Sequence, residues 1–337
     1  MQISFSRPLD LAWSRMKSLL FGPFDLGLWF VLGFTAWLAQ LGESGFGGAT
    51  SRITSSDSFE TVHWDHWGDN AMGSVRDFLS DGLTAVLVGL MVIAGLVIWL
   101  LLLWISSRGR FMLLDNLVHR RSRVQAPWQK FRAQGDSLFL WQIVYTLVAS
   151  VTVLGLVIGG FLLWVPLAAL SASALVAIPL AILTGSLFVL VILVAVYIEF
   201  FLTAFVVPLM YRDGLTATQA WSRWLPLFRD HPGSFVLYGL LYGGIVIVGW
   251  ILFLAAGLAT CCAGWLLLAL PYVGSVITLP LTVFCGYLNL EFLGQFGEDF
   301  RTLPPLASVE IQGDGTMVRP QDRGQDAGPQ EPGPQDS

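Results

Sequence analysis

The first candidates for chemistry are two glutamates and two arginines at the borders of long apolar runs. Glu199 and Glu291 are the acidic residues closest to membrane depth, and Arg108 and Arg110 directly follow another apolar run. A charged side chain at the bilayer centre costs about 2.5–3.5 kcal/mol, so each acid needs a partner or a proton. The sequence therefore predicts an intramembrane polar cluster in which Arg108 or Arg110 pairs with Glu199, with Glu291 as an optional third member. The alternatives are that both acids reach water at the headgroups, or that they relay protons or solutes.

The depths of these groups can be compared by counting to the next tryptophan. Arg108 lies 20 residues before Trp128, and Glu199 lies 22 residues before Trp221. Tryptophan rings settle at membrane interfaces, so the two tryptophans mark a common level. Arg108 and Glu199 are then expected at nearly equal depth, just inside the cytoplasmic face.

A second candidate is a metal site in the segment 43–81, where His63, Asp65 and His66 fall within four residues. Imidazole suits Zn²⁺ or Cu²⁺, but a closed zinc site needs four ligands and no cysteine lies nearby. The tryptophans beside these histidines are better explained by contact with the outer membrane interface, so we predict no metal. The cysteines show neither a disulfide framework nor zinc-ligand spacing; they are Cys261, Cys262 and Cys285.

Known catalytic motifs are missing from the sequence. It contains no P-loop, nucleophile elbow, HExxH or paired-carboxylate pattern. We therefore expect no catalytic residue, no cofactor and no enzymatic activity. The net charge of −5, without a basic stripe, also argues against a nucleic-acid partner.

The composition predicts an all-α integral membrane protein. Only 12% of the 337 residues are charged, about half the usual share of a soluble domain, and 55% are hydrophobic. Residues 137–198 and 232–290 contain no acidic, basic or histidine side chain. A spanning helix needs about 20 apolar residues, so each of these stretches has room for two.

The basic residues predict the orientation. Sixteen of the 18 fall in the N-terminal segment, 106–136, 211–233 and the tail, whereas 43–81 carries seven acids and two arginines. Because positive residues are retained in the cytoplasm, we expect both termini inside and 43–81 as an extracytoplasmic loop. An even number of spans must join the inside segments. The expected spans are about 24–42, 82–105, 138–162, 182–207, 234–257 and 272–296.

Three further segments complete the predicted layout. The apolar segments 163–181 and 258–271 are expected near the outer face, either re-entrant or interfacial, and the sequence does not decide between the two. Residues 301–337 are rich in Pro, Gly, Gln and Asp, which predicts a disordered cytoplasmic tail.

A short pattern with a tryptophan near its start and basic residues after it precedes the first, third and fifth predicted spans. Such segments are expected to lie in the headgroup layer, with tryptophan toward the membrane and arginine toward lipid phosphate. The predicted interfacial anchors are Trp13, Trp128, Trp221 and Trp224. The architecture is then a six-helix bundle over 1–300, made of three repeats of an interfacial helix plus a two-span hairpin. The repeat units are about 7–119, 120–213 and 214–300.

The segments 7–43, 107–141, 205–241 and 292–300 resemble a group of uncharacterised bacterial multi-pass membrane proteins. The same pattern is similar to the membrane domain that precedes the catalytic domain of some glycerophosphodiester phosphodiesterases. The resemblance implies a bacterial cell (inner) membrane location and a six-span domain of unassigned function. It does not imply the phosphodiesterase activity, because only 37 residues follow residue 300.

The expected function is that of a non-enzymatic membrane scaffold or envelope factor. Its expected partners are the lipid bilayer, other membrane proteins or a second copy of itself. The alternative is a small-solute transporter or channel, but the spans offer few polar groups to line a path. A lipid-processing enzyme centred on Arg108, Glu199 and Glu291 is a third class, disfavoured by the missing catalytic cluster.

Overall fold

The computed structural model describes residues 4–22, 24–42, 82–120, 125–169, 174–260 and 270–304. Within these ranges all regular structure is helical, as the composition predicts. The elements are α1 (Ser6–Leu20), α2 (Leu26–Gln40), α5 (Gly82–His119), α6 (Gln125–Lys130), α7 (Arg132–Ala169), α8 (Ala174–Phe201), the π-helical turn η2 (Leu202–Val206), α9 (Val207–Asp213), α10 (Ala217–Asp230), α11 (Pro232–Ala259), α13 (Pro271–Ile277), α14 (Leu279–Leu293) and the 3₁₀ turns η3 (Gly294–Phe296) and η4 (Glu298–Phe300).

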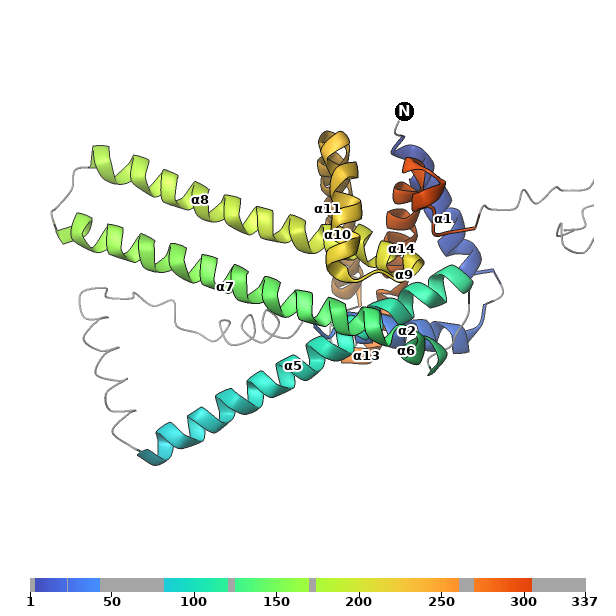
Figure 1. Cartoon of the computed structure of the whole chain (residues 1–337), viewed down its shortest axis with the longest axis horizontal. Helices are drawn as coiled ribbons and strands as arrows, with labels where there is room; N and C mark the ends of the chain where they lie inside the picture. The colour runs from blue at the N-terminus through green and yellow to red at the C-terminus, as the bar shows by residue number, and fades with distance from the viewer. Residues whose placement is uncertain are drawn as a thin grey trace, which may run out of the picture.

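Four stretches of the described chain are long and apolar enough to cross a membrane: Gly82–His119, Arg132–Trp164, Leu175–Asp213 and Pro232–Ala259. Almost none of their most apolar sequence is buried inside the protein. Figure 1 shows α7 and α8 extending side by side, while α5 and α11 leave in other directions. Long apolar helices that no other part of the protein covers are stable when lipid covers them. The protein is therefore a multi-pass membrane protein.

Two of the six predicted spans do not form unbroken helices of spanning length. The segment 24–42 gives α2, whose 15 residues cover about 22 Å at 1.5 Å per residue, less than a bilayer core of about 30 Å. The segment 272–296 is interrupted at Thr278 between α13 and α14. Pro280 explains the interruption, because its ring collides with the carbonyl four residues earlier and it has no N–H to donate.

The predicted outer segments also need correction. Residues 163–181 do not form a separate interfacial or re-entrant helix, because α7 continues to Ala169 and α8 begins at Ala174. Most of 258–271 lies outside the described residues, as do the whole of 43–81 and the tail beyond residue 304.

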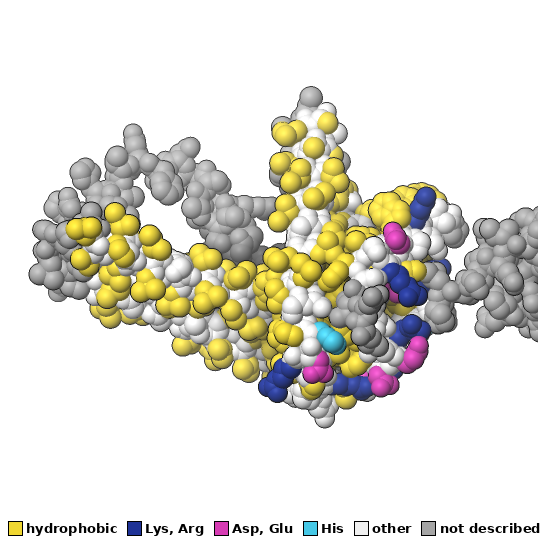
Figure 2. Space-filling model, turned by 90° about the horizontal axis from the view of Figure 1, so that it is seen from above, with side chains coloured by type: hydrophobic (Ala, Val, Ile, Leu, Met, Phe, Trp, Pro, Cys, Tyr) yellow, Lys and Arg dark blue, Asp and Glu magenta, His cyan; other side chains and the backbone are white. Residues whose placement is uncertain are grey.

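The helices meet in a compact head, which we define as α1, α2, residues 103–119 of α5, α6, η2, α9, α10 and residues 271–304. Figure 2 shows Lys, Arg, Asp and Glu side chains gathered on this head, whereas the projecting helices are covered by hydrophobic side chains. The buried core lies in the head and in the adjoining ends of α7, α8 and α11, and it contains many aromatic rings. The charged groups that anchor the apolar helices are therefore brought into one region.

The packing of α2 differs from the predicted first hairpin. We expected 24–42 to pair with 82–105, but α2 packs on the arginine-bearing half of α5. A Cβ on Gly109 would lie 2.7 Å from the Ala39 nitrogen, so only glycine allows the two backbones to approach this closely. Ser106 Oγ donates to the Ala39 carbonyl at 2.6 Å at the same crossing. Ser106 and Gly109 of α5 thus allow α2 to pack closely against α5 in the head.

The helix that carries Glu199 widens just after it. Over Leu202–Val206 the chain forms a π-helical turn before continuing as α9. Pro208 follows at the start of α9, and a proline ring collides with the carbonyl four residues earlier, here that of Ala204. The wider turn relieves this collision and leaves the chain helical between the apolar α8 and the head.

Candidate functional site

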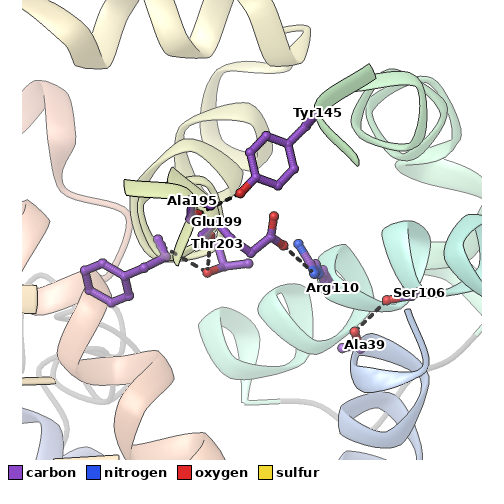
Figure 3. Close-up of polar contacts among 8 residues, drawn as sticks. Ala39, Ser106, Arg110, Tyr145, Ala195, Glu199 and Thr203 are labelled. Atoms are coloured by element: carbon purple, nitrogen blue, oxygen red, sulfur yellow. Dashed lines mark hydrogen bonds and ion pairs between the residues drawn. The ribbon is translucent and has the colours of Figure 1, made fainter. Parts of the chain in front are cut away.

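One pair of the predicted polar cluster forms at the bases of α5 and α8. Arg110 Nη2 donates to Glu199 Oε1 at 3.2 Å, which joins α5 to α8 (Figure 3). The Arg110 side chain is buried, and that of Glu199 is 34% exposed. Oriented to satisfy its surroundings, the buried Gln142 amide of α7 accepts from the same guanidinium at 3.0 and 3.2 Å. The structure thus brings together the predicted partners Arg110 and Glu199.

A tyrosine reinforces the α7–α8 contact beside this pair. Tyr145 Oη donates to the Ala195 carbonyl at 2.7 Å, one helical turn before Glu199 (Figure 3). Thr203 Oγ1 donates back to the Glu199 carbonyl at 3.0 Å. The first bond joins α7 to α8 and the second joins η2 to α8, so together they fix the glutamate's backbone in front of Arg110.

Arg108 has a different partner from the one expected. Its Nη2 donates to Asp136 Oδ1 at 2.8 Å, which joins α5 to α7. The guanidinium lies 4.1 Å from the centre of the Trp104 ring and 5.3 Å from that of Trp128. Trp104 Nε1 also donates to Asp136, at 3.1 Å. Sequence reasoning missed Asp136, although it is the last charged residue before the uncharged stretch 137–198.

Glu291 does not belong to that cluster. It accepts from Arg15 Nε, so the buried pair joins α14 to α1. Arg15 Nη2 also donates to the Pro304 carbonyl at 2.8 Å. The sequence predicts that the arginines of the segment before the first span face lipid phosphate, whereas Arg15 in this segment is only 6% exposed. The two residues are 276 positions apart, and no spacing pattern in the sequence connects them.

The four predicted tryptophan anchors lie in different environments. Trp13 is 58% exposed and suits an interface, but Trp224 is 1% exposed, so the interfacial reading of Trp224 is wrong. Trp224 contacts the rings of Phe201, Phe205, Phe228 and Phe235 in the core. Trp221 stacks on Trp141 at 5.5 Å, and Trp128 meets Trp104 edge-on at 6.0 Å. Both are partly buried.

Metal chemistry finds no support in the part of the chain that the structure describes. No group of three or more His, Cys, Asp or Glu side chains is placed there to hold an ion. The candidates His63, Asp65 and His66 lie outside the described residues, as do Cys261 and Cys262. Cys285 is buried and unpaired by a disulfide.

The three arginine–carboxylate pairs are suited to holding helices together. An arginine guanidinium presents several N–H donors in a fixed geometry that matches a carboxylate. Such a pair restrains two helices strongly where water is scarce. The pairs link α5 to α7, α5 to α8 and α1 to α14. The charged side chains of this site are therefore arranged to hold α1, α5, α7, α8 and α14 in position.

Neutralising Glu199 tests whether the α5–α8 pair carries this restraint. We expect Glu199→Gln to lower the free energy of unfolding by about 1–2 kcal/mol, because Arg110 keeps Gln142 and Glu199 is partly hydrated. In a double-mutant cycle with Arg110→Gln, the two losses should be less than additive, measured by denaturant titration in mixed micelles. Glu298→Gln, at an 83% exposed carboxylate, is the control and should cost nothing measurable. Strict additivity would contradict the pairing.

Comparison with known proteins gives a family match over most of the chain. The model of a family of unknown function (DUF7544) matches residues 6–264. No curated protein and no solved structure matches the chain.

Proposed function

The chain belongs to DUF7544, a family of unknown function, and we propose that it is a non-enzymatic membrane scaffold that binds other membrane proteins through its long apolar helices. One observation carries this proposal. Three ion pairs, Arg15–Glu291, Arg108–Asp136 and Arg110–Glu199, each join two different helices in or beside the head, and the apolar helices beyond them keep their side chains exposed. The ion pairs hold the helices together at the head, and the exposed side chains of the long apolar helices can contact lipid and partner proteins.

The proposed orientation places the head in the cytoplasm of a bacterial cell, with both termini inside the cell membrane. Its support is the distribution of basic residues, 16 of 18 of which fall in the segments assigned to the inside. The order of elements is compatible with three units, in which the short helices α1, α6 and α10 each precede two apolar segments. Reporter fusions that locate 106–136 outside would overturn this orientation.

Photo-crosslinking in whole cells tests partner binding. We would place a photo-reactive amino acid at Leu154 on α7 and at Val189 on α8, which are 58% and 63% exposed. The proposal expects protein adducts of discrete mass at both positions and none at Ser222, an exposed position on α10 in the head. The matched control separates contact along the membrane helices from general proximity.

Two results would contradict the scaffold. Adducts with lipid alone at Leu154 and Val189 would show that no protein covers these helices. Solute flux above that of empty vesicles, measured with the purified chain in liposomes, would favour the transporter or channel instead. Only discrete protein adducts without flux support the proposal.

A further inference from the structure

A cavity of about 590 Å³ lies in the head, between α1 on one side and the end of α14 with the chain that follows it on the other. It is separate from the Arg110–Glu199 cluster. Three arginines line it, Arg7, Arg15 and Arg301, together with two glutamates, Glu291 and Glu298. A volume of this size is in the range of small-molecule sites, which run from about 300 to 1,000 Å³.

The charges in this cavity leave one cation over. Arg15 is paired with Glu291, and Arg301 Nη1 donates to Glu298 at 2.8 Å. Arg7 has no ion-pair partner among the described residues and is exposed. The cavity therefore carries a net charge of +1, and its two carboxylates are already held by guanidinium groups. An anion would meet one unpaired arginine and the remaining N–H groups of Arg301.

The start of α1 lies beside the cavity, since Arg7 and Pro8 line it. The first turn of α1 has neither a capping side chain nor an acidic residue, so no side chain of that turn offsets the positive end of the helix dipole. Gln295 lines the cavity, and its buried Nε2 has no hydrogen-bond partner in the described chain, although its Oε1 accepts from the Ser4 nitrogen. Arginine side chains together with helix N-terminal N–H groups form the donor set that proteins use for phosphate oxygens.

The rest of the lining indicates which phosphate compound fits. The apolar side chains of Leu11, Leu290 and Leu303 form part of the wall, beside Pro8 and Pro304. A bare phosphate ion would leave this surface uncovered, whereas a phosphodiester carries carbon on both sides of its phosphorus. We propose that the cavity binds the phosphodiester headgroup of an anionic phospholipid, with Arg7 and Arg301 on the phosphate and the leucines against the glycerol.

Native mass spectrometry of the full chain in detergent, titrated with phosphatidylglycerol, tests the assignment. We expect one lipid to be retained, and Arg7→Gln to weaken its binding about tenfold, since a charge-assisted hydrogen bond is lost. Arg229→Gln removes one exposed arginine from α10, outside the cavity, and should change the affinity less than twofold. Equal losses in the two variants would reveal general charge attraction and overturn the site.

Two further titrations distinguish the phosphate of a lipid headgroup from a soluble phosphate. Diacylglycerol, which has the same chains and no phosphate, should not be retained. Inorganic phosphate should displace phosphatidylglycerol only at a large molar excess. Displacement at equal concentration would overturn the lipid assignment in favour of a soluble phosphate, and retention of diacylglycerol would overturn phosphate recognition altogether.

Discussion

Replacing Arg15 by glutamine should lower the free energy of unfolding by about 3–5 kcal/mol, because it leaves Glu291 buried without an opposite charge. The side chains of this pair are only 7% and 14% exposed, so water alone would solvate the unpaired carboxylate poorly. The substitution also removes the donor to the Pro304 carbonyl, which ties residues 301–304 to α1. Denaturant titration in mixed micelles, followed by tryptophan fluorescence, measures the change.

The double variant Arg15→Gln/Glu291→Gln distinguishes the ion pair from simple packing. Two neutral amides of similar volume can bond to each other, so the double variant should recover most of the stability that the single variant loses. Arg7→Gln is the matched control on the same helix, and because Arg7 is exposed it should stay within about 0.5 kcal/mol of the parent chain. A double variant as unstable as Arg15→Gln would show that Glu291 contributes no charge interaction.

The second large effect is expected at Trp224. Trp224→Ala should cost about 3–5 kcal/mol, because it leaves a large cavity among the rings of Phe201, Phe205, Phe228 and Phe235. Trp13→Ala should cost far less, since Trp13 is 58% exposed and its ring lies 6.1 Å from that of Phe284. The same titration measures both. Equal losses of unfolding free energy in the two variants would contradict the core position of Trp224 and favour the interfacial anchor predicted from the sequence.

Trp224→Phe separates the ring from its polar group. The indole Nε1 of Trp224 is buried without a hydrogen-bond partner in the described chain. Replacing the indole by a phenylalanine ring therefore removes volume from the core but no hydrogen bond within the described chain. We expect this variant to lose less than about 1.5 kcal/mol. A loss as large as that of Trp224→Ala would show that the indole nitrogen bonds to a group outside the described residues.

The candidate site was partly predictable because depth in a membrane can be counted along the chain. Equal distance from an interfacial tryptophan led to the Arg108/Arg110–Glu199 pairing, and the structure joins Arg110 to Glu199. The choice between the two arginines could not be made this way. It depends on which face of α5 each one occupies relative to α7 and α8, and that follows from how the helices pack. Asp136 then takes Arg108.

The expected direction of Arg15 was wrong for a related reason. Leu9, Trp13, Met16 and Leu20 form an apolar stripe at helical spacing, but an apolar stripe predicts burial without saying whether lipid or protein provides it. In the structure α14 covers α1, and the buried face is turned toward Ala12, Arg15 and Met16. Arg15 can occupy that face only because Glu291 comes to meet it.

Taken alone, the amino-acid order was enough to establish an all-helical membrane chain with its charges confined to a few short segments, since long uncharged stretches have no stable place in water. It could also rank residues by depth, because depth follows from position along a helix of constant rise. Partner choice and helix continuity were decided in three dimensions. The crossing of α2 over Gly109, the break at Thr278 and the Arg15–Glu291 contact each depend on residues brought together from distant parts of the chain or on local backbone geometry, which periodicity does not encode.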